Sequence, residues 1–185
     1  MPPFPREELE EMVERWLAAN RRAEEENDWK PMAELYTPDA TYGWNLGPGG
    51  EFMAVGRDEI REVALGQEMG GLDGWSYPYV EVLIDDRKGQ VIGLWRQIAD
   101  ATRADGSGYE VAGIGGSWFR YGGNWQWSWQ RDFFDFGNVT HPFIEMIKAD
   151  ALSPGMTKRM ERATSGQKLP GHYRLGQAPL GLWEG

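Results

Sequence analysis

The first third of the chain carries apolar residues at helical spacing. Residues 6–26 predict an amphipathic helix, because apolar side chains recur there every three or four residues, at Leu9, Met12, Val13, Trp16 and Leu17. Residues 28–36 predict a second, short helix capped by Asp28, and residues 58–65 predict a third. Between these two helices, residues 40–45 predict a strand.

From residue 75 onward, the pattern changes to that of strands. Four β-rich runs cover residues 75–85, 91–103, 109–121 and 125–136, and turn signals such as Asp-Gly and Gly-Gly-Asn separate them. These runs predict an antiparallel meander. Helices followed by an antiparallel sheet indicate the α+β class, here as one domain over residues 1–140 whose three helices precede the sheet.

The remaining residues, 141–185, form a different kind of segment. Residues 142–151 predict a helix, and residues 153–185 are rich in Gly and Pro with little periodicity. From Lys148 onward there are six basic residues against three acidic ones, which leaves a net charge of −13 on residues 1–147. We therefore expect this helix and tail to pack on the acidic body of the same chain or of a partner subunit.

Tryptophan dominates one face of the last β-rich run. Side chains alternate across a strand, which places Trp125, Trp127 and Trp129 together. Three adjacent tryptophans are costly to leave in water, and aromatic residues are enriched at subunit interfaces. We therefore expect a homodimer through this face, with a platform for stacking a ligand as the alternative.

The opposite face of that run carries Asp132 between Gln130 and Phe134. A carboxyl group on the helix-covered side of a sheet must be paired, protonated or catalytic, because an unpaired buried carboxylate costs several kcal/mol. Asp132 is the first candidate for catalysis. The alternative is a structural ion pair with an arginine such as Arg96.

Two other β-rich runs carry residues that can line the same pocket as Asp132. In the third run, Gly113, Gly115 and Ser117 share a face with Phe119, and the glycines either open a pocket in front of the sheet or let it bend. In the second run, Arg96 shares a face with Asp100. That face either points inward, toward Asp132, or belongs to a solvated edge strand.

Five more residues are candidates for the pocket. Asn20 lies on the buried stripe of the first helix and needs a polar partner, either a ligand group or a backbone carbonyl. Tyr42 and Trp44 alternate on the first strand, and Asn45 ends it. His141 follows the last strand and is placed to reach the mouth of a cavity, whereas His172 in the tail is expected on the surface.

Composition and charge narrow the classes of function. The 185 residues include 10 Trp, 7 Tyr, 7 Phe and 25 Gly, a mixture that suits an aromatic-walled pocket or interface. With no Cys and two His, thiolate metal sites, iron–sulfur clusters and histidine-only metal sites are excluded, and we expect no metal or cofactor. A net charge of −10 opposes nucleic-acid binding. Without a membrane span or leader pattern, we expect a cytoplasmic protein.

Short motifs in the chain resemble one superfamily. Two helices, Tyr-Thr-Pro-Asp-Ala-Thr-Tyr (36–42), Val-Gly-Arg-Asp-Glu-Ile (55–60) and a meander ending in Trp-Gln-Arg-Asp-Phe-Phe-Asp (129–135) resemble the nuclear transport factor 2-like superfamily, and within it the SnoaL-like group. The resemblance covers residues 7–140. It implies a cone-shaped, bent sheet wrapped by helices around a largely apolar pocket, usually in a dimer formed through the outer sheet face.

The superfamily includes enzymes and non-catalytic members, so the fold alone does not decide function. The ketosteroid isomerase pattern does not match. Its base, its oxyanion-hole tyrosine and its protonated acid fall on Trp44, Asn20 and Ser117.

Limonene epoxide hydrolase is a nearer resemblance. Its water-activating aspartate falls on Asp132, its tyrosine on Tyr42, its asparagine on Asn45 (or Trp44 by a strict count) and its bridging arginine on Arg96. Its proton-donating aspartate falls on Ile98, with Asp100 as the nearest substitute.

These observations predict a cofactor-free acid–base enzyme acting on a hydrophobic small molecule such as a terpenoid, steroid, polyketide or aromatic compound. Asp132 is the base, Arg96 pairs with it, and Tyr42 or Asn45 orients water or a substrate oxygen. Trp44, Phe119 and Phe134 form the apolar wall. The reactions that need only these groups are epoxide hydration, dehydration, isomerisation and a lyase step. The alternative is a non-catalytic binding or dimeric assembly module of the same fold.

Overall fold

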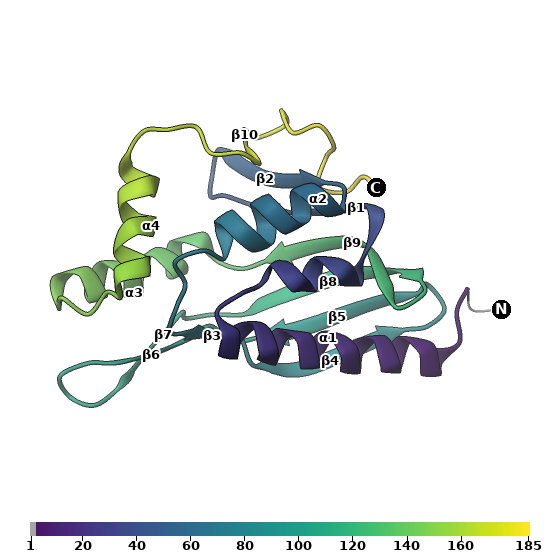
Figure 1. The fold of residues 1–185 in the computed structure, drawn as a ribbon, viewed down its shortest axis with the longest axis horizontal. Helices are drawn as coiled ribbons and strands as arrows, with labels where there is room; N and C mark the ends of the chain where they lie inside the picture. Colours follow the sequence, from purple (N-terminus) through teal and green to yellow (C-terminus); the bar gives the residue numbers. More distant parts are fainter. Residues whose placement is uncertain (1–2) are drawn as a thin grey trace.

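The computed structural model describes residues 3–185 as a large curved sheet with helices against one face and a second, smaller sheet at one end. Figure 1 shows the helix α1 lying along the sheet and the helices α3 and α4 gathered at the end that carries the small sheet. This is the α+β, cone-shaped arrangement that the sequence predicts.

The N-terminal helices agree with the hydrophobic pattern. α1 (Arg6–Glu26) buries Leu9, Met12 and Trp16 on one stripe, and the short 3₁₀-helix η1 (Lys30–Leu35) follows it. The predicted third helix is one helical turn, α2 (Arg57–Glu59), that continues as a π-helix, η2 (Ile60–Glu68). π-Helical segments are rare and often occur at functional sites.

The large sheet has the strand order β10-β2-β1-β9-β8-β5-β4. Its strands, in chain order, are β1 (Tyr36–Asn45), β2 (Gly50–Val55), β4 (Tyr79–Asp85), β5 (Gln90–Trp95), β8 (Gly115–Gly123), β9 (Gln126–Phe133) and β10 (His172–Arg174). β1 and β9 run parallel, and every other neighbouring pair is antiparallel. The sheet is therefore mixed rather than purely antiparallel. This parallel pair brings the beginning of the domain next to its last long strand.

Three of the predicted runs break at the end of the cone. The small sheet consists of β3 (Trp75–Ser76), β6 (Ile98–Thr102) and β7 (Gly108–Glu110), so residues 75–85, 91–103 and 109–121 each divide between the two sheets. The break in the second run falls at Arg96, whose backbone N–H donates to Pro78 O at 3.1 Å. Alternation along the sequence does not reveal such a change of sheet.

The C-terminal segment holds more regular structure than its sequence predicts. α3 (Phe136–Lys148) begins six residues before the predicted start, because Asp135 caps it by accepting from the N–H groups of Gly137 and Asn138 at 2.8 and 3.1 Å. α4 (Pro154–Thr164) lies in the stretch expected to lack periodicity, and Ser153 caps it. β10 then adds an edge strand to β2.

The three tryptophans expected on one face do not share it. The pairing of β8 with β9 shifts between Arg120 and Tyr121, so a β-bulge turns Trp127 to the inside of the sheet. Trp129 lies on the outer face, where its Nε1–H donates to Glu184 O of the tail at 2.9 Å. Trp125 lies in the turn before β9 with 37% of its surface exposed. The expectation that these three tryptophans share one face is therefore wrong, and the chain's own tail covers Trp129. The homodimer itself stays a prediction.

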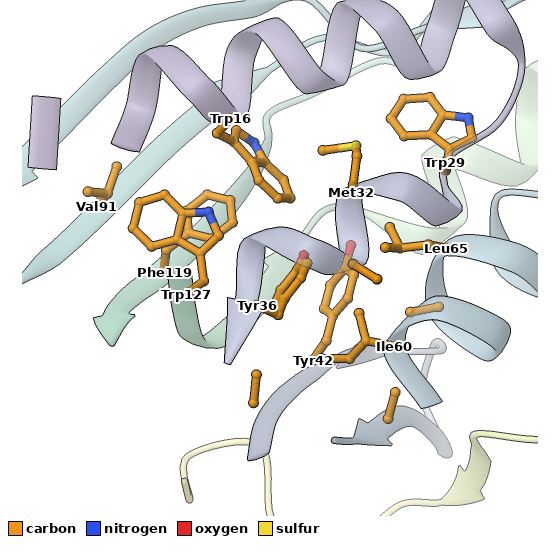
Figure 2. Packing of buried hydrophobic residues seen from close by; sticks show 14 of the residues in the cluster. Trp16, Trp29, Met32, Tyr36, Tyr42, Ile60, Leu65, Val91, Phe119 and Trp127 are labelled. Carbon is orange, nitrogen blue, oxygen red and sulfur yellow. The ribbon is translucent and has the colours of Figure 1, made fainter. Parts of the chain in front are cut away.

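The main core lies between α1 and the inner face of the sheet, and it is strongly aromatic (Figure 2). Phe119 stacks on Trp127 with ring centroids 4.7 Å apart, and Trp16 packs edge-on against Phe119 at 5.0 Å. Phe119 is 1% exposed. It belongs to this core and not to the wall of the cavity, which corrects the expectation from the sequence.

Candidate active site

A cavity of about 320 Å³ lies between the inner face of the sheet and the helices. Most of its wall is apolar and aromatic, with side chains from α1, η1, η2, the sheet, α3 and α4. The aromatic residues of the wall are Trp16, Trp29, Tyr42, Trp44, Tyr77, Tyr79, Trp95, Phe134, Phe136 and Phe143. A concave, largely apolar site with few polar groups is typical of a small-molecule pocket.

Asp132 is the carboxylate of this pocket that comes from the sheet. The parallel register pairs Tyr42 with Gln130, so the tyrosine on β1 reaches Asp132 one pleat further along β9. The Tyr42 hydroxyl donates to Asp132 Oδ2 at 2.5 Å, and Gln130 Nε2 donates to Asp132 Oδ1 at 2.8 Å. Tyr36 donates in turn to Gln130 Oε1, which fixes the amide. Both carboxylate oxygens are thus held in one orientation.

The surroundings of Asp132 set its acidity. Burial raises the pKa of Asp132 above its ordinary value of 3.8, and hydrogen bonds from Gln130 and Tyr42 offset part of that rise. Burial and the nearby Asp132 carboxylate both raise the pKa of Tyr42 well above 10, so the tyrosine stays protonated and remains the donor. The result is a carboxylate that is more basic than usual in an apolar pocket, a combination common at catalytic sites.

The glycines of the third run make room for an aromatic side chain. A Cβ on Gly115 would lie 2.2 Å from Cζ3 of Trp95, so only glycine admits this ring beside β8. Trp95 lines the cavity and donates from Nε1 to Ser117 Oγ at 3.0 Å. Ser117 also lines the cavity, and it lies opposite Asp132 in the register of β8 and β9. The open space predicted from the glycines is therefore partly filled by Trp95.

Two tyrosine hydroxyls on another wall each accept a hydrogen bond. Trp16 Nε1 donates to the hydroxyl of Tyr79 at 2.9 Å, and Gln97 Nε2 donates to the hydroxyl of Tyr77 at 3.2 Å. Burial raises the pKa of both phenols far above the usual range. Both stay neutral, and each hydroxyl keeps its own proton, with which it can donate to a ligand oxygen.

Several residues predicted from the sequence do meet in this pocket. Asn20, Tyr42, Trp44, Ser117, Asp132 and Phe134 all line it. The amide of Asn20 donates to Glu24 Oε1 at 2.9 Å, which satisfies the polar residue on the buried stripe of α1. Trp44 stacks on Phe52 with centroids 3.8 Å apart and presents an apolar wall.

Four predicted residues lie elsewhere. Arg96 points away from Asp132 and forms a two-bond ion pair with Glu110, at 2.7 and 2.6 Å. Asp100 and Asn45 are exposed, and neither lines the cavity. His141 is also exposed and lies 3.8 Å from Glu145. In the second run the face that turns inward is the one with Trp95 and Gln97. The sequence left that choice open. The charged side chains of Arg96 and Asp100 are exposed to solvent, as the alternative expected, but β5 and β6 are interior strands of their sheets and not edge strands.

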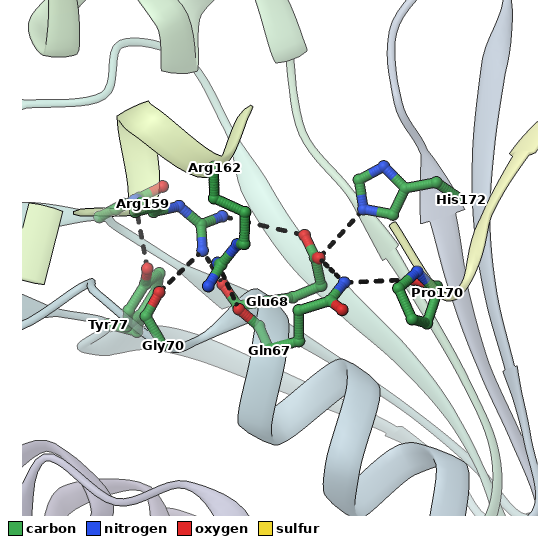
Figure 3. Close-up of polar contacts among 9 residues, drawn as sticks. Gln67, Glu68, Gly70, Tyr77, Arg159, Arg162, Pro170 and His172 are labelled. Carbon is green, nitrogen blue, oxygen red and sulfur yellow. Dashed lines mark hydrogen bonds and ion pairs between the residues drawn. The ribbon is translucent and has the colours of Figure 1, made fainter. Parts of the chain in front are cut away.

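The structure adds a polar group that the hydrophobic pattern did not reveal (Figure 3). Glu68 at the end of η2 and Arg159 on α4 both line the cavity. His172 Nε2 lies 3.0 Å from Glu68 Oε1, so this histidine is partly buried against the body rather than a free surface group. The sequence held one signal for this group: Glu68 lies eight residues after Ile60 and therefore on the same, apolar side of η2.

Across residues 3–185, no cluster of three or more His, Asp or Glu side chains is arranged to hold a metal ion. In the same part of the chain, no helix is long and apolar enough to cross a membrane.

The chain belongs to the family of SnoaL-like domains, whose model matches residues 13–126. The fold is that of the nuclear transport factor 2-like superfamily, which the sequence motifs resemble. No curated protein matches the chain.

Solved structures with this fold match about three quarters of the chain. A SnoaL-like polyketide cyclase candidate from Jannaschia sp. CCS1 is 14% identical with a TM-score of 0.54, over 73% of this chain and 90% of its own. A polyketide cyclase candidate from Xanthomonas campestris pv. campestris is 17% identical with a TM-score of 0.50, over 74% and 97%. Bal32a, from a soil-derived mobile gene cassette, is 23% identical with a TM-score of 0.51, over 73% and 95%. At these identities the likeness shows the fold.

Proposed function

We propose that this protein is a cofactor-free acid–base enzyme that acts on an apolar, polyketide-like or aromatic small molecule. The observation that carries the proposal is Asp132, held at both oxygens inside an aromatic pocket with Tyr42 2.5 Å away. A positioned carboxylate with a raised pKa is a general base, and such a group typically contributes about 10²–10⁴-fold to a rate. Two solved structures with the same fold are named as polyketide cyclase candidates, which favours substrates of that chemical class.

The proposed chemistry is proton transfer at carbon. Asp132 removes a proton from a carbon next to a carbonyl group, and the phenols of Tyr77 and Tyr79 donate to the oxygen on which negative charge develops. The protonated Asp132 then returns the proton to another carbon or to a departing hydroxyl. The first outcome is an isomerisation and the second a dehydration. A lyase or cyclisation step uses the same carbanion.

Epoxide hydration has weaker support than proton transfer at carbon. Of the residues that the limonene epoxide hydrolase pattern requires, Tyr42 and Asp132 are in contact in the pocket. Arg96 pairs with Glu110, and Asn45 is exposed. The arginine and the asparagine of that pattern are thus outside the cavity.

The base can be tested without knowing the natural substrate. 5-Nitrobenzisoxazole is a small aromatic compound whose isoxazole ring opens when a base removes the C–H proton of that ring and the N–O bond breaks, which releases a coloured phenolate. We expect the wild-type protein to accelerate this elimination and the Asp132→Asn variant to lose about 10²–10⁴-fold of the rate. Asp100→Asn removes an exposed carboxylate and is the control, with an unchanged rate.

An equal rate for wild type and Asp132→Asn would contradict the enzymatic proposal. It would favour the alternative of a non-catalytic small-molecule-binding module. Native mass spectrometry of the purified protein, followed by extraction of any retained compound, identifies the chemical class of the ligand under either function.

A further inference from the structure

The cavity has a second polar wall, formed by Glu68 from the C-terminal end of η2 and Arg159 from α4 (Figure 3). Their side chains are 11% and 23% exposed, so both are largely withdrawn from solvent. Neither contacts Asp132 or takes part in the proposed proton transfer. A charged pair in an otherwise apolar wall therefore needs its own explanation.

The carboxylate of Glu68 is fixed at one oxygen and open at the other. Oε1 accepts from Gln67 Nε2 at 2.8 Å and lies 3.0 Å from His172 Nε2. Oε2 lies 3.9 Å from Arg159 Nη2, beyond hydrogen-bond distance. Within residues 3–185, Oε2 accepts no hydrogen bond.

The guanidinium group of Arg159 likewise forms hydrogen bonds through only one of its two terminal nitrogens. Its Nη1 donates to two backbone carbonyls at the end of η2, Glu68 O and Gly70 O, the latter at 3.2 Å. Carbonyls at the C-terminal end of a helix lack helical partners, so these bonds anchor the guanidinium plane. In the described part of the chain, Nη2 makes no hydrogen bond. One donor and one acceptor therefore face each other across a narrow gap in the cavity wall.

We propose that Glu68 and Arg159 bind a hydroxyl group of the substrate, so that the substrate is a phenol, an enol or an alcohol on an apolar skeleton. The gap of 3.9 Å is shorter than the sum of one N–H···O bond of about 2.9 Å and one O–H···O bond of about 2.7 Å. A single hydroxyl oxygen therefore accepts from Arg159 Nη2 and donates to Glu68 Oε2 at the same time.

The charges of the pair exclude the other common polar groups. A ligand carboxylate that binds Arg159 is repelled by Glu68, and a ligand ammonium that binds Glu68 is repelled by Arg159. A ketone or an ether offers no proton, and Glu68 Oε2 stays unpaired against it. The charges and hydrogen bonds of the pair therefore select a neutral group that is both donor and acceptor.

This inference deepens the proposed function and rests on its small-molecule pocket, but it concerns binding and not turnover. It can therefore be tested apart from Asp132. The neutral fluorescent probe N-phenyl-1-naphthylamine reports occupation of an apolar pocket, and three naphthalenes of one skeleton serve as competitors: 2-naphthol, 2-methoxynaphthalene and 2-naphthoate. Near neutral pH, 2-naphthol is uncharged and donates a proton, whereas its methyl ether cannot donate.

From the displacement of the probe, we expect the affinity for 2-naphthol to be about 10- to 100-fold higher than for 2-methoxynaphthalene or 2-naphthoate. An analogue that leaves a partly buried charged group unpaired binds weakly. The Arg159→Met variant should reduce this preference to near unity. Arg162→Met is the matched control, since Arg162 lies on the same helix and donates to Gln67 O at 2.9 Å but does not line the cavity. That variant should keep the preference.

Equal affinities of the three competitors for the wild-type protein would overturn the inference, and this measurement needs no variant to fold. Tighter binding of 2-naphthoate would also overturn it and would assign an anion to Arg159. Either result leaves the role of Asp132 intact, because the elimination of 5-nitrobenzisoxazole does not depend on this pair. Failure of the probe to bind at all would instead remove the pocket and both proposals with it.

Discussion

The hydroxyl of Tyr42 donates to the carboxylate of Asp132 at 2.5 Å, across two strands that lie 90 residues apart in the sequence. The bond exists because β1 and β9 are parallel neighbours in the sheet. It places a phenol that stays protonated beside a carboxylate whose pKa burial has raised. We therefore expect these two side chains to set the acidity of the pocket together.

Replacing Asp132 by Asn should stabilise the protein at neutral pH. The pKa of Asp132 is raised above 3.8 in the folded state, so ionisation of this carboxyl group destabilises the fold. The loss of stability grows as the pH rises from 3.8 to the raised pKa and is constant at higher pH. The amide of the variant does not ionise. The variant's melting temperature should exceed that of wild type near pH 7, by about 2–4 °C for each kcal/mol gained. The difference should disappear in acid, and thermal unfolding across a pH series measures it.

If the Asp132→Asn variant instead melts below wild type at neutral pH, that result would contradict the inference that ionised Asp132 lowers the stability of the fold. It would indicate that the carboxylate is a structural acceptor for Tyr42 and Gln130.

Tyr42→Phe should shift the acid limb of the rate profile to higher pH. The Tyr42 hydroxyl lowers the pKa of Asp132 against the larger effect of burial, so its loss lets that pKa rise further. At a pH on the acid limb, less of Asp132 is then ionised and the elimination of 5-nitrobenzisoxazole slows. Tyr36→Phe is the comparison, since Tyr36 donates to Gln130 and not to Asp132. If the acid limbs of Tyr42→Phe and wild type fall at the same pH, the Tyr42 hydroxyl does not set the pKa of Asp132.

Glu68→Gln should have the opposite pH signature to Asp132→Asn. Burial alone would raise the pKa of Glu68, but its bonds to His172 and Gln67 and the charge of Arg159 bring it below its ordinary value of 4.5. Glu68 therefore contributes stability that is present above about pH 4.5 and is lost as the pH falls through the lowered value. Glu68→Gln should lower the free energy of unfolding at pH 7 by about 1–2 kcal/mol. Urea unfolding should show that this difference in the free energy of unfolding disappears in acid. A difference that does not change with pH would contradict a stabilising role of ionised Glu68.

Deleting residues 179–185 should make the chain self-associate. This segment supplies the carbonyls of Leu182 and Glu184 that accept from Arg131 at 2.7 and 2.9 Å, and it covers Trp129, which is 1% exposed. Its removal uncovers Trp129 and the neighbouring ring of Trp118 on the outer face, and an enlarged apolar patch promotes association. Sedimentation velocity over a range of concentrations measures this.

The matched control for that deletion is Leu175→Ala. Leu175 lies in the same tail but outside the deleted segment and is 60% exposed, so its loss should change neither the sedimentation nor the melting temperature by much. A deletion variant that sediments like the full chain would show that the tail does not prevent association through this face.

Local structure and the identity of the central carboxylate could be predicted from the sequence. The apolar spacing of Leu9, Met12 and Trp16 predicts α1, since only a helix puts these residues on one side. Alternation along residues 125–136 assigns Gln130, Asp132 and Phe134 to the inner face, and all three line the cavity. Both results depend on neighbours within a few positions, which is the range over which periodicity carries information.

The contacts between distant segments came from the three-dimensional fold alone. The bulge opposite Tyr121 moves Trp127 from the outer face to the core, because one extra residue reverses the alternation before it. The change of sheet at Arg96 sends that side chain to Glu110 instead of Asp132. Glu68 and Arg159 meet although they are 91 residues apart, because α4 packs across the end of η2. Such pairings arise from strand register and helix packing over long separations, and no local pattern in the sequence encodes them.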